Sequence, residues 1–346
     1  MQQQPAGLAG AISGISNNIL VIAGGNNFPD SMPWLGGKKK YYSQIYVFSK
    51  QHDTLVMQPK IWQLPEPIGY AATGISTRGI VYAGGENENG ISKKAGLLQW
   101  DAQATNVTVQ LLPDLPLPLT NAAAAVYHDQ VYVAGGETGM GVSDHLFMLD
   151  LTDTRAGWKQ LPSVPKALSH SLAVVQINGG HDNLYLLGGR KKNSNGVSDL
   201  YATVFAFDLI TRQWRQKKSL PYALSAGTGV ASDHHHILVL GGDTGKTFHQ
   251  TEILLAAIAG ENDPVRKQAF ASQKNNLQYT HPGFSREILE YNTITGTCSA
   301  AGTLPFETPV TTHAFLWNNE IVIPTGETRA GVRTGSILMG ELKNRQ

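Results

Sequence analysis

The chain has 346 residues, of which 15% are charged, and its formal net charge is +1. Nucleic-acid and membrane surfaces usually select a basic excess, so neither is expected as the main partner. The single cysteine, Cys298, excludes an intrachain disulfide framework and a cysteine-based zinc site.

An apolar, β-branched run that ends in a glycine pair recurs along the chain. The second glycines of these pairs are Gly25, Gly85, Gly136, Gly189 and Gly242, and a sixth copy is reduced to Pro324-Thr325-Gly326. Successive copies are 60, 51, 53, 53 and 84 residues apart. Short strands at such a period are typical of a β-propeller with one blade for each repeat.

Other parts of the unit recur around each glycine pair. A strand of small residues precedes it, as in 121–126, and an alternating strand follows it, as in 146–150. A last strand often opens with tryptophan and ends in Leu-Pro, as from Trp158 to Leu161-Pro162. Together these parts are the Kelch pattern. The sequence therefore predicts an all-β, six-bladed Kelch-type β-propeller that forms a single domain over residues 1–346.

The two ends of the chain predict how the ring closes. Six glycine turns are present, but only five Leu-Pro strands follow them, and the last unit stops after the strand at 336–342. We expect residues Gln2 to Pro5 to supply the missing outer strand. The ring is then closed by pairing N-terminal and C-terminal strands, which removes unpaired sheet edges.

The fifth unit carries a long insertion, because its spacing is 84 residues where its neighbours have 53. The extra residues, about 260–285, are polar and have no periodicity typical of a core. Long loops in compact domains are usually functional. We expect a lid-like segment over the central site that contributes residues such as Arg266 or Tyr279.

Polar residues follow the glycine turns at one face of the predicted propeller, where loops on a rigid scaffold concentrate function. Four of these, predicted to bind substrate, are Asn26, Glu86, Glu137 and Arg190. His170 and His313 enter inner strands on the same face and are predicted to join them. This mixture suits a polar, neutral-to-anionic small molecule. The acids could instead bond the backbone of neighbouring blades.

The last glycine turn is followed by an acid and an arginine six residues apart, Glu327 and Arg333, around Gly331. Such a loop can fold back and aim both side chains at one point. A carboxylate can transfer a proton, and the planar fork of arginine can bind a substrate carboxylate by paired hydrogen bonds.

The stretch Gly-Glu-x-x-x-Gly-x-Arg-Thr at 326–334, the six Kelch units and the insertion together resemble the bacterial sialic acid mutarotases (N-acetylneuraminate epimerases). Because the Glu/Arg loop comes last here, the chain resembles a cyclically permuted branch of that family. The resemblance implies interconversion of the α and β anomers of N-acetylneuraminate or a related acidic sugar, with Glu327 as proton acceptor and Arg333 as carboxylate partner. This chemistry passes through the open-chain ketose, so we expect no cofactor and no metal. The reduced glycine pair before Glu327 departs from the repeat.

A second class of function is a non-catalytic Kelch propeller that binds a protein or a glycan through the same face. Such modules normally carry an attached partner domain, which favours the enzyme here. No apolar stretch approaches the ~20 residues of a membrane span, so we expect no membrane insertion. The expected location is periplasmic if a signal peptide preceded this chain, and cytoplasmic otherwise.

Overall fold

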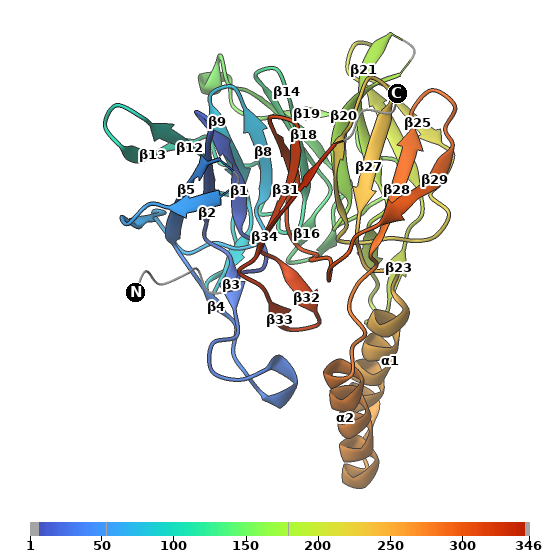
Figure 1. The fold of residues 1–346 in the computed structure, drawn as a ribbon. Helices are drawn as coiled ribbons and strands as arrows, with labels where there is room; N and C mark the ends of the chain where they lie inside the picture. The colour runs from blue at the N-terminus through green and yellow to red at the C-terminus, as the bar shows by residue number, and fades with distance from the viewer. Residues whose placement is uncertain (1–6, 53, 179, 343–346) are drawn as a thin grey trace.

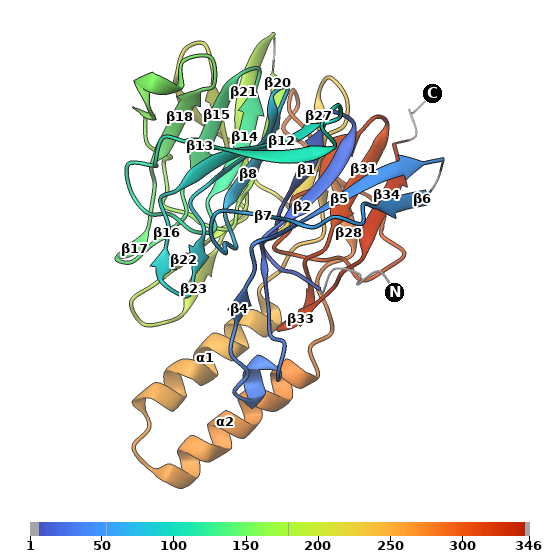
Figure 2. The ribbon, with the colours of Figure 1, turned by 90° about the vertical axis from the view of Figure 1, so that its left-hand side faces the viewer.

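The computed structural model describes residues 7–52, 54–178 and 180–342. Its strands form six larger antiparallel sheets and five two-stranded ribbons, and a pair of helices projects from one end of the molecule (Figures 1 and 2). We number the larger sheets as blades 1 to 6 in chain order. The prediction of a six-bladed propeller is confirmed. The predicted strand at Gln2 to Pro5 lies outside the described residues.

The first three blades each run from an inner strand outward. Blade 1 contains β1 (Ile12–Ser16), β2 (Ile19–Ala23), β5 (Gln44–Gln51), β6 (Thr54–Met57) and β7 (Trp62–Gln63). Blade 2 contains β8 (Ala72–Ser76), β9 (Gly79–Ala83), β12 (Ala95–Asp101) and β13 (Asn106–Leu112). Blade 3 contains β14 (Ala123–Tyr127), β15 (Gln130–Ala134), β18 (Leu146–Asp150) and β19 (Lys159–Leu161).

The other three blades follow the same plan. Blade 4 contains β20 (Leu172–Asn178), β21 (His181–Leu187), β24 (Val204–Asp208) and β25 (Trp214–Lys217). Blade 5 contains β26 (Thr228–Ala231), β27 (His236–Leu240), β28 (Glu287–Asn292) and β29 (Cys298–Thr303). Within the described residues, blade 6 contains β30 (Phe315–Trp317), β31 (Glu320–Pro324) and β34 (Ile337–Glu341).

A two-stranded ribbon follows the glycine turn in five blades. The ribbons are β3 (Asn26–Asn27) with β4 (Lys40–Tyr41), β10 (Glu86–Asn87) with β11 (Gly90–Ile91), β16 (Glu137–Thr138) with β17 (Gly141–Val142), β22 (Arg190–Lys192) with β23 (Ser198–Leu200), and β32 (Glu327–Arg329) with β33 (Val332–Arg333). In blade 5 this place is taken by α1 (Lys246–Gly260) and α2 (Pro264–Tyr279). Short 3₁₀ turns occur at η1 (Pro33–Leu35) and η2 (Thr154–Ala156).

The glycine pairs join each blade to the next. Gly84 and Gly85 both have positive φ, and a Cβ at Gly84 would lie 2.2 Å from the carbonyl oxygen of Leu119 in the connection to blade 3. The N–H of Gly85 donates to that same oxygen at 2.7 Å. Only glycine permits this approach without strain. Apolar clusters between neighbouring blades complete each junction, one of them uniting Leu8 and Leu20 of blade 1 with Phe315 of blade 6.

The ring closes between blades 6 and 1 through described residues. The N–H of Gly326 donates to the carbonyl oxygen of Leu8 at 2.7 Å, and the N–H of Leu8 donates to that of Thr334 at 3.3 Å. The first contact reproduces the glycine junction that follows blades 1 to 4. In the described part of the chain, no helix is long and apolar enough to cross a membrane.

Candidate active site

A cavity of about 520 Å³ lies at the end of the propeller that carries the ribbons and the helices. Such a volume is typical of small-molecule sites. The predicted site residues that line it are Glu86, Glu137, His170, Arg190, Glu327 and Arg333. Residues from four ribbons therefore meet at one cavity, as their shared position after the glycine turns predicts.

A ring of backbone hydrogen bonds forms the floor of this cavity. Tyr70, Asn121 and His170 enter the inner strands of consecutive blades with φ of 54° to 57°. The N–H of Asn121 donates to the carbonyl oxygen of Tyr70 at 3.0 Å, and the N–H of His170 donates to that of Asn121 at 3.0 Å. Left-handed backbone is uncommon in non-glycine residues, and at functional sites it holds side chains in fixed positions. The three side chains are thereby aimed into the cavity that they line.

Glu327 and Arg333 lie opposite each other on the ribbon of blade 6. They are direct partners in the pairing of β32 with β33. Glu327 Oε2 lies 2.8 Å from Arg333 Nη1, and Glu327 Oε1 accepts a hydrogen bond from the N–H of Gly331 at 2.7 Å. The turn at Gly331 therefore brings the acid and the arginine together, as the sequence spacing predicts.

Arg333 is held by aromatic residues from other blades. Its guanidinium carbon lies 4.9 Å from the centre of the Phe28 ring, and its Nη2 donates to the Tyr70 hydroxyl at 3.4 Å. The side chain is only 4% exposed. Within the described residues, its Nε has no hydrogen-bond acceptor. A buried guanidinium with an unused donor is suited to bind an anionic group of a ligand.

Burial raises the pKa of the Glu327 carboxyl. Arg333 and the N–H of Gly331 act in the opposite direction, because both stabilise the carboxylate. Burial prevails in this balance. A carboxyl group whose pKa is raised towards neutrality is a better general base than an ordinary surface glutamate.

The wall next to Arg333 comes from blades 1 and 2. Lys39 Nζ lies 3.1 Å from Glu86 Oε1 and 4.9 Å from the centre of the Tyr70 ring. The Tyr41 hydroxyl also donates to Glu86, and burial followed by this contact raises the pKa of Tyr41. Glu86 therefore lines the cavity while it accepts hydrogen bonds from both Lys39 and Tyr41.

Asn26, predicted to bind substrate, does not line the cavity. Its side chain is fully buried, and its amide donates to the carbonyl oxygen of Ala9 at 2.8 Å. Its Oδ1 accepts from the Tyr70 hydroxyl at 3.1 Å. The residue therefore positions Tyr70, because its own polar atoms are used within the protein.

The wall formed by blades 3 and 4 carries a second acid and arginine. Arg190 Nη2 lies 3.5 Å from Glu137 Oε1 and 3.3 Å from His170 Nε2. Ser169 Oγ donates to Glu137 Oε1 at 2.9 Å. Burial, and then the neighbouring Arg190 guanidinium, hold the pKa of His170 well below its usual value. Burial therefore favours the neutral form of His170.

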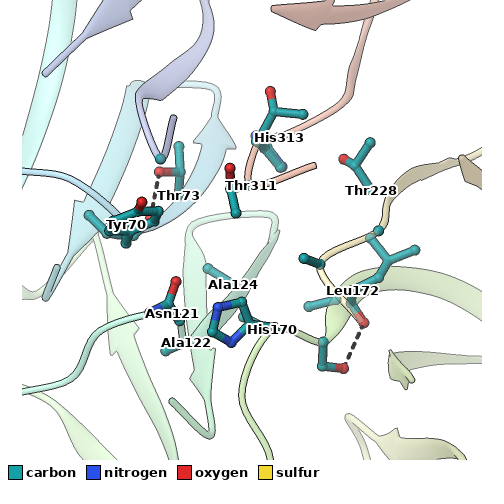
Figure 3. A pocket seen from close by; sticks show the side chains of 18 of the residues that line it. Tyr70, Thr73, Asn121, Ala122, Ala124, His170, Leu172, Thr228, Thr311 and His313 are labelled. Carbon is teal, nitrogen blue, oxygen red and sulfur yellow. Dashed lines mark hydrogen bonds between the residues drawn. The ribbon is translucent and has the colours of Figure 1, made fainter. Parts of the chain in front are cut away.

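His313 lies in the narrower channel below the cavity (Figure 3). This channel has a volume of about 120 Å³ and shares Tyr70, Asn121, His170 and Thr311 with the cavity above it. Burial lowers the pKa of His313 to about 4. His313 thus lines only the channel, whereas His170 lines both the channel and the cavity.

The inserted segment begins earlier than expected and is helical. It extends over α1 and α2, so residues 246–259 belong to it as well as the predicted 260–285. Phe248, Thr251 and Leu255 of α1 line the cavity. Gln278, His281 and Phe284 of the predicted range 260–285 also line it. The two residues named as examples, Arg266 and Tyr279, do not, because their side chains are 70% and 74% exposed.

Several cavity residues were not predicted from the sequence. Tyr70, Lys39 and Phe28 reach the cavity from blades 1 and 2, and Phe248 reaches it from α1. Their positions depend on contacts between segments that are distant in the sequence, and a local motif cannot predict such contacts. Among the described residues, no cluster of three or more histidine, cysteine or acidic side chains could hold a metal ion.

Comparisons with known proteins agree with this architecture. The structure titled "Structure of YjhT" superimposes with a TM-score of 0.67 at 15% identity, over 100% of this chain and 98% of that one. That likeness shows the fold. The sequence family described as N-acetylneuraminate epimerase matches residues 112–346. The chain belongs to this family. The match contains Glu137, His170, Arg190, His313, Glu327 and Arg333.

Individual relatives show the same relationship. The N-acetylneuraminate epimerase of Salmonella typhimurium strain LT2 is 28% identical over 236 residues, which are 65% of this chain and 57% of the relative. That of Haemophilus influenzae strain PittEE is 25% identical over 236 residues, 68% of this chain and 60% of the relative. That of Yersinia pestis strain Pestoides F is 26% identical over 242 residues, 69% and 59% respectively. The chain thus spans about three fifths of the length of these relatives.

Proposed function

We propose that the chain is an isomerase that interconverts the α and β anomers of N-acetylneuraminate or a related acidic sugar. The observation that carries this proposal is the pair of Glu327 and Arg333 at a cavity of about 520 Å³. Membership of the N-acetylneuraminate epimerase family supports the choice of substrate.

The proposed reaction requires proton transfer and no redox step. Glu327 accepts the proton of the anomeric hydroxyl, the bond between the anomeric carbon and the ring oxygen breaks, and the ring oxygen takes up a proton from solvent water. Rotation in the open-chain ketose then exposes the other face of the carbonyl. The reverse steps close the ring, so protons balance over the cycle. A general base of this kind contributes about 10²- to 10⁴-fold.

Arg333 would bind the sugar carboxylate next to the anomeric carbon. The guanidinium has five N–H donors, and the contact with Glu327 leaves others free. Phe28 and Tyr70 hold the guanidinium in one plane. Fixed orientation of this kind places the anomeric carbon beside the Glu327 carboxylate, and positioning is itself a large part of catalysis.

The experiment that tests this proposal follows the anomers directly. Freshly released α-N-acetylneuraminate is mixed with the protein, and its conversion to the β anomer is recorded by NMR. We expect the conversion to be faster than in buffer alone in proportion to the protein concentration. Binding of the sugar without acceleration would instead support a non-catalytic glycan-binding propeller.

A further inference from the structure

The cavity contains two acid–arginine pairs, on facing sides of the ring. Glu327 and Arg333 belong to blade 6, whereas Glu137 and Arg190 are the first ribbon residues of blades 3 and 4. In a ring of six blades, blade 3 lies opposite blade 6. Each arginine also lies over a phenylalanine ring. Arg333 is 4.9 Å from the ring of Phe28 in the loop between β3 and β4, and Arg190 is 4.5 Å from the ring of Phe248 in α1.

The two pairs differ in how strongly the acid and the arginine engage each other. The contact between Glu327 and Arg333 is 2.8 Å, while that between Glu137 and Arg190 is 3.5 Å. The second distance is at the limit of a hydrogen bond. Arg190 is also 19% exposed, compared with 4% for Arg333. The second pair therefore keeps donors and acceptors available at the cavity surface.

We propose that Arg190 and Glu137 form a second subsite that binds the uncharged, hydrogen-bonding end of the sugar acid, away from its carboxylate. This inference rests on the proposed function. A guanidinium only donates hydrogen bonds and a carboxylate only accepts them. Groups that do both, namely hydroxyls or a secondary amide, match such a pair. N-acetylneuraminate carries both kinds, a glycerol side chain and an acetamido group, on ring carbons remote from the carboxylate.

The neighbours of the pair support a neutral ligand end at this wall. Glu137 already accepts from Ser169 Oγ at 2.9 Å, and neutral His170 lies 3.3 Å from Arg190. One acid therefore balances one arginine, with no excess positive charge to select a second carboxylate. Phe248 stacks on the guanidinium and fixes its plane. The subsite is thus rigid, which makes it a source of specificity.

The test measures dissociation constants, so that it does not depend on catalysis. Arg190→Lys removes the fork and Glu137→Gln removes the charge while keeping the shape. Each is titrated with N-acetylneuraminate, with the seven-carbon analogue whose side chain has been shortened, and with the analogue that has a hydroxyl in place of the acetamido group. We expect each variant to bind N-acetylneuraminate about tenfold or more weakly, as for loss of a charge-assisted hydrogen bond.

The analogues identify which group occupies the subsite. If the side chain is bound there, the penalty of each variant shrinks for the shortened analogue. If the acetamido group is bound there, it shrinks for the hydroxyl analogue. If each variant loses the same affinity for all three ligands, or loses affinity for none of them, the inference is overturned.

The matched control is Arg78→Lys, because Arg78 pairs with Asp129 at 2.8 Å on the surface, away from the cavity. It should bind all three ligands as the wild type does. Thermal unfolding checks that each variant is folded. Failure of the wild type to accelerate anomer exchange would contradict the proposed function alone, since selective penalties in binding would still support the subsite.

Discussion

Glu327 occupies a place that every blade fills, the residue directly after the glycine turn, where it pairs with the segment entering the inner strand. It differs from the corresponding residues of the other blades because the chain turns at Gly331 and places Arg333 opposite Glu327 on the ribbon. Gly331 has a φ of +79°, and a Cβ there would lie 2.6 Å from Cγ of Pro33. The loop of blade 1 therefore packs onto this turn, and only glycine fits beneath it.

Replacing Arg333 with lysine should weaken substrate binding about tenfold. A point charge would still balance Glu327, but the planar fork for the substrate carboxylate would be lost. Titration of N-acetylneuraminate measures the effect. The matched control is Arg329→Lys on the same ribbon, because Arg329 pairs with Glu307 at 2.6 Å and does not line the cavity. Equal losses in the two variants would contradict the role of Arg333.

Anomer exchange should depend on pH through Glu327. Burial raises the pKa of this carboxyl, and a base must be unprotonated to act. The rate should therefore fall as pH decreases through a pKa above the ordinary glutamate value of about 4.3. Exchange rates from pH 4 to 8, corrected for the buffer reaction, measure this. An acid limb centred at or below the ordinary glutamate value would contradict the proposed environment of the base.

The sequence predicted this pair because its geometry is local: six residues and one glycine turn suffice. Tyr70 and Phe28 could not be found in the same way, since they reach Arg333 from blades 2 and 1. Asn26 shares its place with Glu86 and Glu137, yet it is buried against Ala9. Sequence position identified the ring of turns, but only packing decides which side chains enter the cavity.

At the scale of elements, the helical hairpin is the main departure from the repeat. Glu252 anchors α1 to blade 4, because it accepts from the N–H of Ser198 at 2.8 Å and from its hydroxyl at 2.7 Å. Asp263 caps α2 by accepting from the N–H of Arg266 at 2.9 Å. Because α2 buries no residue, its sequence has no apolar stripe that would predict a helix. The start of the hairpin, at Lys246 of α1, was not predicted from the sequence.

Removing the whole hairpin should weaken substrate binding about tenfold while leaving the melting temperature nearly unchanged. Replacement of residues 246–280 by a Gly-Ser linker deletes Phe248, Thr251 and Leu255 from the cavity wall. Among the described residues, the clusters between blades contain none of the hairpin. Titration and thermal unfolding measure the two effects.

The control deletes only residues 257–267 at the far end of the hairpin, which keeps the cavity-lining residues of α1. Binding should then match that of the full chain. If the two deletions weaken binding equally, the hairpin does not act through these contacts. A large fall in melting temperature on whole removal would show instead that it is structural packing.

At the scale of the molecule, six repeats and closure of the ring were predictable because each blade repeats one pattern. The junction of blades 5 and 6 departs from that pattern. A Cβ at Gly241 would meet the Thr308 side chain at 2.3 Å, whereas Gly84 faces a leucine carbonyl. An apolar cleft of about 280 Å³ lies there, between Leu240 of blade 5 and Leu338 of blade 6.

The range of the family match bears on the predicted permutation. It begins at Leu112, the last residue of β13, and so covers blades 3 to 6. A circular permutation predicts this pattern. Blades 1 and 2 would have moved from one end of the chain to the other, so only blades 3 to 6 would keep the same order as in the family and match it without a break. The permutation itself stays a prediction.

Removing residues 1–6 should lower the melting temperature by roughly 1–2 °C for each kcal/mol of stability lost. The reason is the predicted outer strand at Gln2 to Pro5, which would protect the edge of β34. Hydrogen exchange at Ile337–Glu341 should become faster in the same variant. Removal of residues 343–346 is the matched control. Unchanged exchange along β34 after the N-terminal deletion would contradict this closure.

The role of Glu327 as the base is tested by comparing Glu327→Gln with the wild type in the NMR assay of anomer exchange. The amide keeps the shape and some hydrogen bonding of the side chain but cannot accept the proton. Exchange should fall by about 10²- to 10⁴-fold, towards the rate in buffer, while N-acetylneuraminate still binds through Arg333. If the variant exchanges the anomers as fast as the wild type, Glu327 is not the base and the proposed mechanism is wrong.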